Sequence, residues 1–417
     1  MTPARAHVLL VVVVAGFGAP VSAAQPLALK APAALPQTPP AQPADTGPAS
    51  GSADRLLPPQ DAPTQSAEAT PGPAQLLDLL LNRGSSAKPG PAVDHQEPIP
   101  DGNDPATLRN ACWTPAQLAG SPTDRTIQRG LKPDRTPPPA WAIRAAETAL
   151  PPLAHGLKGS IRSVEPADPQ ARLVALTFDL CEQAGERAGY DAELVDALRA
   201  QGVKATFMAG GKWLRTHPEQ AMQLMADPRF EIGNHSWTHA NLRVVEDREV
   251  REQILWTQAE YQVLRRELAE RPCAQAAGAA AMSRVPAWPV VFRFPYGTCN
   301  QGSLDAAAAL GLPAIQWSIV TGDPDKGQSA AAIARAVLAG VKGHRGAIVV
   351  AHANGRGWNT ARALPLFVPE LLKQGYRFVT VSELLSAGRP VAVEECYEER
   401  PGDNRRYDAL FGRGSKR

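Results

Sequence analysis

Apolar strand-like runs and amphipathic helical segments alternate from Arg172 to Leu385, and this alternation constrains the fold more than any other feature. Short apolar runs such as "RLVALTF", "KATFMAG" and "GAIVVAHAN" are typical of buried strands. Segments such as "DAELVDALRAQG" carry apolar residues at helical spacing between them. This order predicts parallel βαβ units and an α/β fold. Because six or seven such units are present, we expect a (β/α) barrel rather than an open sheet.

The N-terminal part of the chain differs in composition from the rest. "VLLVVVVAGFGAPV" followed by "SAAQ" has the apolar core and small residues of a secretory signal peptide, cleaved near Ala23 or Ala24. Residues 25–105 are rich in Pro, Ala, Gln, Ser and Gly, which predicts a disordered Pro-rich linker. We therefore expect a signal peptide at 1–24, a linker at 25–105, a folded domain at 106–400 with its core at 172–385, and a basic tail at 401–417.

Charge and hydropathy limit the partners of the chain. The formal net charge of +2 is too small to indicate nucleic acid as a partner. Nothing after the signal peptide resembles a membrane helix, so we expect a periplasmic or secreted protein with no stable membrane anchor.

Export makes the five cysteines candidates for disulfide bonds, and one of the five must be left over. Cys112 and Cys396 flank the apparent catalytic region, so we expect one bridge to join its two ends. Cys273 and Cys299 bracket an Ala-rich insertion and could close it as a loop. Cys181 would then be the free thiol.

Polar side chains gather where the predicted strands end. In barrels of this kind, functional residues lie at the C-terminal ends of the strands. A single such residue is more often structural, but this number at equivalent positions predicts a functional rim. The residues are Asp179, Asn234, His235, His239, Arg293, Asp323, His352 and Asn354.

The motif "HSWTH" places two imidazoles four residues apart, a spacing that allows His235 and His239 to bind one metal ion. Ser236 occupies the position that the general base has in the metalloprotease motif HExxH. The base must therefore come from elsewhere, and Asp179 is the candidate. A metal lowers the pKa of its bound water to about 7, so Asp179 could deprotonate that water for attack on a carbonyl.

The remaining rim residues supply the other groups that amide hydrolysis needs. Arg293 could hold Asp179 ionised and oriented by a charge-assisted contact. His352 could donate a proton to the leaving nitrogen because its pKa lies near the working pH. Asp323 could raise the pKa of His352 or orient Arg293. The backbone N–H of Tyr296 could contribute to an oxyanion site.

The order of "TFD", "HSWTH", "RFPYG", a strand ending in Asp and "AHAN" resembles the polysaccharide deacetylase family, the metal-dependent carbohydrate esterases with a NodB homology domain. The resemblance covers residues 172–385 and implies a distorted (β/α) barrel that removes acetyl groups from N-acetylated sugars. It implies that Asp179 is the base and that His235 and His239 bind the metal. It also implies that Arg293 orients the base and that His352 is the catalytic acid.

Leu180 departs from the family pattern, because typical members read TFDD and the second Asp completes the protein ligands of the metal. Leucine has no donor atom, and two histidines alone would bind zinc poorly. We expect Glu182 to supply the missing ligand, with Cys181 as the alternative. A site that works without metal is the third possibility.

The sequence therefore favours an exported deacetylase that hydrolyses N-acetyl, or O-acetyl, groups of a cell-wall or extracellular polysaccharide. Tyr296, Trp237 and Asn354 are the expected substrate contacts, with Trp237 as a wall on which a sugar stacks. Two alternatives stay open: hydrolysis of another linear or cyclic amide, and a catalytically silent glycan-binding module. The presence of base, orienting arginine and acid together argues against the silent module.

Overall fold

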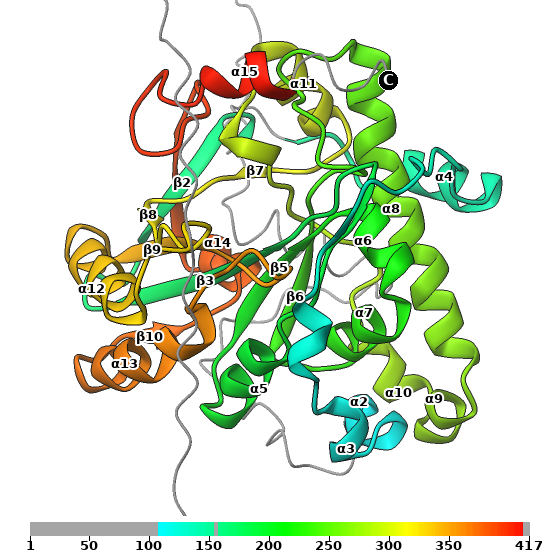
Figure 1. Cartoon of the computed structure of the whole chain (residues 1–417), viewed down its shortest axis with the longest axis horizontal. Helices are drawn as coiled ribbons and strands as arrows, with labels where there is room; N and C mark the ends of the chain where they lie inside the picture. The colour runs from blue at the N-terminus through cyan, green and yellow to red at the C-terminus, as the bar shows by residue number, and fades with distance from the viewer. Residues whose placement is uncertain (1–106, 154–156, 412–417) are drawn as a thin grey trace, which may run out of the picture. The chain divides into compact units, whose positions relative to one another are not determined.

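The computed structural model describes residues 107–153 and 157–411 (Figure 1). The predicted signal peptide, the predicted linker and the last residues of the predicted tail lie outside these ranges. Among the described helices, none combines the length and the apolar character that a membrane crossing requires.

A mixed β-sheet forms the centre of the described region, with strand order β11-β2-β9-β3-β5-β6. Strands β9, β3, β5 and β6 run parallel to one another, whereas β2 is antiparallel to both β9 and β11. Three two-residue strands extend the sheet: β10 pairs with β3, β7 with β2 and β8 with β9. The bounds are β2 Ser160–Pro166, β3 Leu173–Leu180, β5 Ala205–Ala209, β6 Phe230–Asn234, β7 Ala314–Ile315, β8 Ile319–Val320, β9 Gly346–His352, β10 Arg377–Phe378 and β11 Gly388–Val393.

The sheet curls into a distorted barrel. Single parallel bridges join Asn234 of β6 to Phe292, and Phe292 to Ala314 of β7, and β7 pairs with β2. The ring of strands is therefore completed through one residue rather than a full strand. The predicted distorted (β/α) barrel is confirmed, and "VVFRFPYG" contributes only this bridge residue to it rather than a full strand. The segment after α11 (Gln301–Ala309) forms two short strands, β7 and β8.

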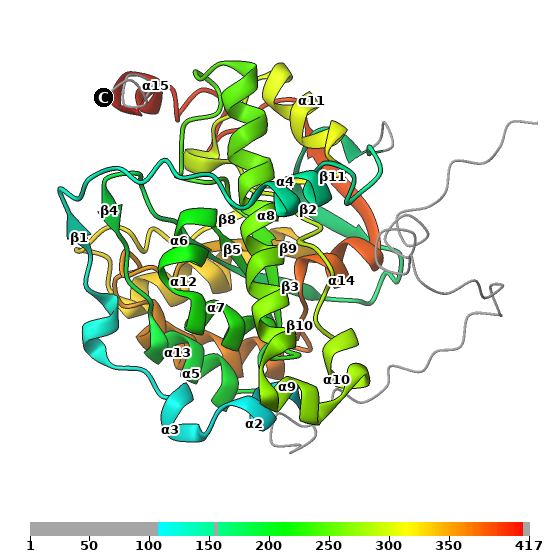
Figure 2. The ribbon, with the colours of Figure 1, turned by 90° about the vertical axis from the view of Figure 1, so that its right-hand side faces the viewer.

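Helices cover the outside of the sheet. On one side α12 packs on α13, which packs on α5; on the other, α8 contacts α4, α6, α7 and α11. Figure 2 shows α8 running along the face turned toward the viewer. The bounds are α4 Ala140–Glu147, α5 Ala192–Ala200, α6 Gly211–Thr216, α7 Pro218–Met225, α8 Asp247–Glu270, α11 Gln301–Ala309, α12 Ala330–Gly340, α13 Thr360–Lys373 and α14 Val381–Ser386.

Strand β3 separates two apolar clusters by the alternation of its side chains. Val174, Leu176, Phe178 and Leu180 belong to the cluster under α5 and α13, whereas Leu173 and Ala175 belong to the other cluster. Side chains two residues apart point to the same face of a strand. Thr177 and Asp179 therefore continue the face of Leu173 and Ala175, and Leu180 points to the opposite face.

Two disulfide bonds differ from the predicted pairing. Cys112 at the end of α2 (Leu108–Cys112) pairs with Cys273 in α9 (Pro272–Ala277), and Cys299 pairs with Cys396. The predicted Cys112–Cys396 and Cys273–Cys299 bridges were wrong, because α2 packs directly against α9 and so brings Cys112 to Cys273. The expected free thiol of Cys181 is confirmed.

The remaining elements are short, and two of them, β1 and β4, pair antiparallel as a separate two-stranded sheet. The residues after β11 continue to a short helix, α15, which lies within the segment expected to be a basic tail. The bounds of these elements are α3 Pro115–Leu118, η1 Pro122–Arg125, β1 Gln128–Arg129, β4 Glu186–Arg187, α10 Ala279–Ser283, η3 Pro295–Gly297, η4 Val341–Gly343 and α15 Arg406–Phe411.

Candidate active site

Asp179 and His352 lie opposite each other where two neighbouring parallel strands end. In the register of β3 and β9, Asp179 pairs with His352. On the other side of β3, Leu180 pairs with Ala209 of β5, and Ala209 pairs with Asn234 at the end of β6. The residues that follow β6 begin the "HSWTH" motif, so the sheet brings the three predicted motifs to one edge.

Arg293 holds the Asp179 carboxylate in place. Its Nη1 donates to Asp179 Oδ1 over 2.7 Å, and its Nη2 donates to Thr177 Oγ1 over 2.7 Å. The Arg293 side chain is fully buried, and its remaining donors reach the Ile315 and Gln316 carbonyls. Burial alone would raise the pKa of Asp179, but the charge and the hydrogen bond of the Arg293 guanidinium outweigh burial and lower it. Asp179 is thus kept ionised, as a general base must be.

Asp323 holds His352 on the opposite side of the site. Asp323 Oδ1 lies 2.9 Å from His352 Nδ1, and Oδ2 accepts from the His352 backbone N–H over 2.8 Å. Thr321 and Thr360 donate their hydroxyls to the same carboxylate. Burial would lower the pKa of His352, but the Asp323 carboxylate outweighs burial and raises it. A protonated His352 is the form that a general acid requires.

Cys181, His235 and His239 form a cluster that could hold a metal ion. Cys181 Sγ and one ring nitrogen of each histidine lie within 4.8 Å of one another. His235 Nδ1 bonds the Arg293 carbonyl over 2.8 Å, which leaves Nε2 for a ligand. This Nε2 is buried without a hydrogen-bond partner and lies 3.4 Å from Asp179 Oδ2.

The chemistry of the three donors fits a soft divalent ion such as zinc. Burial lowers the pKa of His235, and it lowers that of His239 further, so both imidazoles are neutral and can donate a lone pair. Burial raises the pKa of the Cys181 thiol to about 12. A metal must therefore displace this proton when it binds, as it does at thiolate sites in general.

The expectation that Glu182 is the third ligand is contradicted by the structure. Its Oε1 lies 2.6 Å from Lys212 Nζ, and its Oε2 accepts from Thr216 Oγ1 and the Ala188 N–H. The carboxylate is thus fully engaged in an ion pair away from the histidines. Cys181, two residues beyond Asp179, reaches the cluster instead.

Two of the three expected substrate contacts have other roles. Trp237 is 2% exposed and packs on Trp256, so it offers no face to a sugar. Asn354 is fully buried, and its Nδ2 donates to the Cys181 carbonyl over 2.8 Å and to Cys181 Sγ over 3.1 Å. Tyr296 does lie at the site: its ring meets that of His239 edge-on, with centroids 4.3 Å apart.

Sequence reasoning missed an ion pair beside the site. Arg356 Nη2 contacts both oxygens of Glu186 at 2.6 and 2.7 Å. The Arg356 charge partly offsets the rise that burial causes in the pKa of the Cys181 thiol. At His239 the same charge adds to the lowering of the pKa that burial causes. Neither residue belongs to a recognisable motif, so only the folded loops reveal the pair. Thr177 was also missed, although its position two residues before Asp179 on one strand face was a usable signal.

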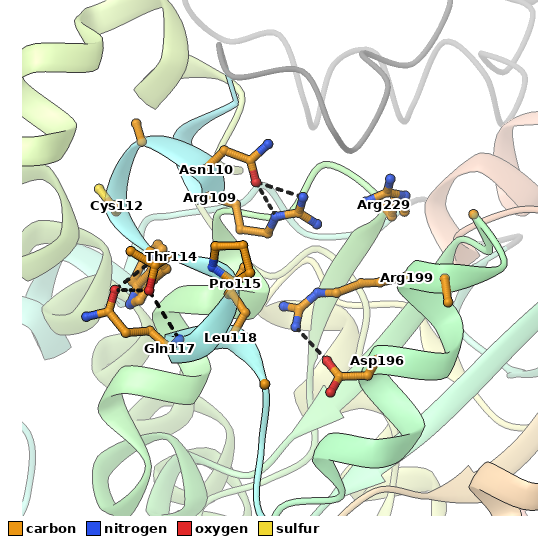
Figure 3. Close-up of a pocket in the computed structure, with 15 residues that line it drawn as sticks. Arg109, Asn110, Cys112, Thr114, Pro115, Gln117, Leu118, Asp196, Arg199 and Arg229 are labelled. Carbon is orange, nitrogen blue, oxygen red and sulfur yellow. Dashed lines mark hydrogen bonds and ion pairs between the residues drawn. The ribbon is translucent and has the colours of Figure 1, made fainter.

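A cavity of about 960 Å³ lies elsewhere in the structure (Figure 3). Arg199 in α5 and Arg229 just before β6 line it, so it lies where the strands begin. Arg109, Arg199 and Arg229 all form ion pairs with Asp227, at 2.8, 3.0 and 3.4 Å. None of the predicted site residues lines this cavity.

Comparison with known proteins agrees with the motifs. A family model described as polysaccharide deacetylase matches residues 167–315. A peptidoglycan-N-acetylglucosamine deacetylase of Bacillus cereus is 30% identical over 218 residues, which cover 52% of this chain and 69% of that protein. The chain belongs to the polysaccharide deacetylase family. The resemblance inferred from the sequence is thereby confirmed.

Other members of the polysaccharide deacetylase family match in part. The peptidoglycan-N-acetylglucosamine deacetylase of Listeria monocytogenes is 30% identical over 271 residues, which are 65% of this chain. The match spans 48% of that relative, about half its length. A solved family 4 carbohydrate esterase from Streptomyces lividans, in complex with acetate, has 26% sequence identity and a TM-score of 0.40. The match covers 53% of this chain and 97% of that one.

Proposed function

We propose that this protein hydrolyses N-acetyl groups of a cell-wall or extracellular polysaccharide. The observation that carries the proposal is that two groups with pKa values shifted in opposite directions, Asp179 and His352, lie together where two strands end. Arg293 favours the ionised form of Asp179 and Asp323 favours the protonated form of His352, on paired positions of adjacent strands. Amide hydrolysis needs a base and an acid whose pKa values are shifted in opposite directions by their surroundings. Relatives named peptidoglycan deacetylases support an acetylated glycan as the substrate.

Cys181, His235 and His239 would hold a zinc ion beside this base. When bound, the metal would supply Lewis acidity that activates water and polarises the acyl carbonyl. His235 can present only Nε2, since Nδ1 is engaged by the Arg293 carbonyl. Asn354 would orient the sulfur through its amide N–H. A thiolate replaces the aspartate that typical members of the family carry one position earlier in the chain.

In the proposed reaction, residues of this chain move protons at two points. Asp179 Oδ2 takes a proton from the attacking water as the new C–O bond forms. The backbone N–H of Tyr296 could donate to the developing oxyanion. His352 then donates its ring proton to the leaving nitrogen as the C–N bond breaks, which yields acetate and the free amine. Arg293 and Asp323 act through their partners, because they lower the pKa of Asp179 and raise that of His352.

Acetate release from defined substrates tests this proposal. The protein would be incubated with acetylated chitin oligomers, peptidoglycan and acetylated xylan, with and without a chelator. We expect release that the chelator abolishes and zinc restores, and we expect Asp179→Asn to abolish turnover without loss of fold. Acetate release that the chelator does not reduce would support a hydrolase that works without a metal. No release from any of the three would leave the other-amide hydrolase or the silent glycan-binding module.

We further propose that the protein acts outside the cytoplasm, in the periplasm or after secretion. The signal-like N-terminal sequence supports this location, as do relatives named for peptidoglycan. The domain division expected from the sequence remains part of this proposal. N-terminal sequencing of the mature protein from cell fractions would test it, with a new N-terminus near Ala24 or Gln25 expected. A cytoplasmic protein that keeps Met1 would contradict it.

A further inference from the structure

The C-terminal helix α15 contacts the site through a series of aromatic rings. The Phe411 ring stacks on Tyr296 with centroids 4.3 Å apart and an interplanar angle of 9°. The Tyr407 ring lies 5.3 Å from that of Tyr296. Tyr296 in turn meets the edge of His239 at 4.3 Å. Part of the segment that the sequence predicts to be a basic tail is therefore two ring contacts away from a metal-ligand candidate.

Both residues at the end of this series have backbones that need support. Tyr296 has a φ of 58° and His239 a φ of 55°, which is the left-handed region that non-glycine residues rarely adopt. Such conformations are unfavourable for non-glycine residues and persist only where the surroundings enforce them. No hydrogen bond of the His239 ring is found within the described ranges, so ring packing against Tyr296 and His235 is what orients it.

The segment that carries α15 is fastened to the loops that bear these two residues. The Cys299–Cys396 bridge joins it to the chain just beyond η3. Asn404 is fully buried and donates from Nδ2 to the carbonyls of Gly297 and Cys396.

A second attachment reaches the chain just after the "HSWTH" motif. Asp408 Oδ1 accepts from Asn241 Nδ2 over 2.9 Å and from Arg243 Nε over 2.9 Å. Arg243 Nη1 also donates to Asn404 Oδ1 over 2.9 Å. The helix is thereby tied to both loops that its aromatic residues help to hold.

We propose that α15 is a clamp that presses Tyr296 onto His239 and so fixes a metal ligand. Phe411 and Tyr407 are then positioning residues for the site. The proposal rests on the metal cluster of the proposed function and goes beyond it, because it makes the C-terminal segment a working part of the active site. Groups that orient metal ligands from outside typically change metal affinity 10–100-fold when removed.

The test compares two truncations on the same helix in the full chain. Phe411→Ala removes the ring that stacks on Tyr296, whereas Leu410→Ala removes a side chain that is 66% exposed and serves as the matched control. Zinc affinity would be measured by competition with a chromogenic chelator. We expect Phe411→Ala to weaken zinc binding roughly tenfold or more, Leu410→Ala to leave it unchanged, and Phe411→Tyr to restore it. Equal affinities of Phe411→Ala and Leu410→Ala would overturn the clamp.

A second readout separates the clamp from the proposed function. The histidine ring signals in NMR spectra of the metal-free protein report on His239 whether or not zinc binds. We expect these signals to shift and broaden in Phe411→Ala and to stay in place in Leu410→Ala. If the unmodified protein binds no zinc, the proposed metal site is wrong. The spectra still test whether α15 positions the His239 ring. Unchanged His239 signals in a folded Phe411→Ala protein would refute it, and Phe411→Leu serves if the alanine variant does not fold.

Discussion

Replacing Arg293 with methionine tests the electrostatics of the site most severely. The Arg293 side chain is 0% exposed and that of Asp179 is 7% exposed, and the two are joined at 2.7 Å. Removing one member of a buried ion pair leaves the other charge without compensation, which costs roughly 3–5 kcal/mol. We expect Arg293→Met to lose about this much free energy of unfolding at neutral pH, where Asp179 is charged.

The loss should depend on pH in a defined direction. In the unchanged protein the lowered pKa of Asp179 gives stability that is present above the unfolded pKa and is lost as pH falls through the folded pKa. Without Arg293, burial dominates and raises the pKa of Asp179, so protonation relieves the penalty in the variant. The stability difference should therefore shrink as pH falls, and the acid limb of the pH–rate profile should move to higher pH.

Urea unfolding at neutral pH and at about pH 4 would measure this difference. Arg248→Met is the control, because Arg248 pairs with Glu252 on the surface with its side chain 89% exposed, and such pairs contribute at most about 0.5 kcal/mol. A loss in Arg293→Met that is equal at both pH values would show that packing, not charge, is what Arg293 supplies. A loss no larger than that of the control would show that Arg293 does not stabilise the buried Asp179 carboxylate.

Three further predictions follow from the same contacts. Asp323→Asn should lower the pKa of His352 and move the basic limb of the pH–rate profile to lower pH, whereas an unmoved limb would remove His352 as the acid. Cys181→Ser should lose zinc in equilibrium dialysis and Glu182→Gln should keep it; the reverse would reinstate Glu182. Leu180→Asp should destabilise the fold without adding a ligand, because Leu180 is fully buried in the apolar cluster, and tighter zinc binding by this variant would contradict that placement.

Much of the site could be predicted from the sequence because polar residues that end a strand directly follow a recognisable apolar run. Asp179 and His352 each close an apolar run, and the parallel register then brings them together. Asp323 and Arg293 follow shorter or irregular strands, yet the repeated βαβ order still places them at the same rim. The fold class was predictable for the same reason. Strand-like and helix-like hydrophobic patterns alternate along the chain even where a strand is reduced to one bridge residue.

The failures share a physical cause, which is that sequence position does not determine where a side chain points once a strand ends. Glu182 seemed the natural replacement for an aspartate, but beyond the end of β3 the Cys181 sulfur reaches the two histidines and Glu182 pairs with Lys212. Trp237 lies between two site histidines in sequence and is nevertheless buried against Trp256. The disulfide pairing depended on α2 packing against α9, a contact between distant segments.

We expect Cys181, His235 and His239 to hold one metal ion beside Asp179 and His352. A crystal soaked in zinc, with anomalous diffraction recorded at the zinc edge, tests it most directly. We expect a peak about 2.3 Å from the Cys181 sulfur and about 2.0–2.1 Å from a nitrogen of each histidine. A peak bound to Glu182, or no peak within reach of the two histidines, would contradict it.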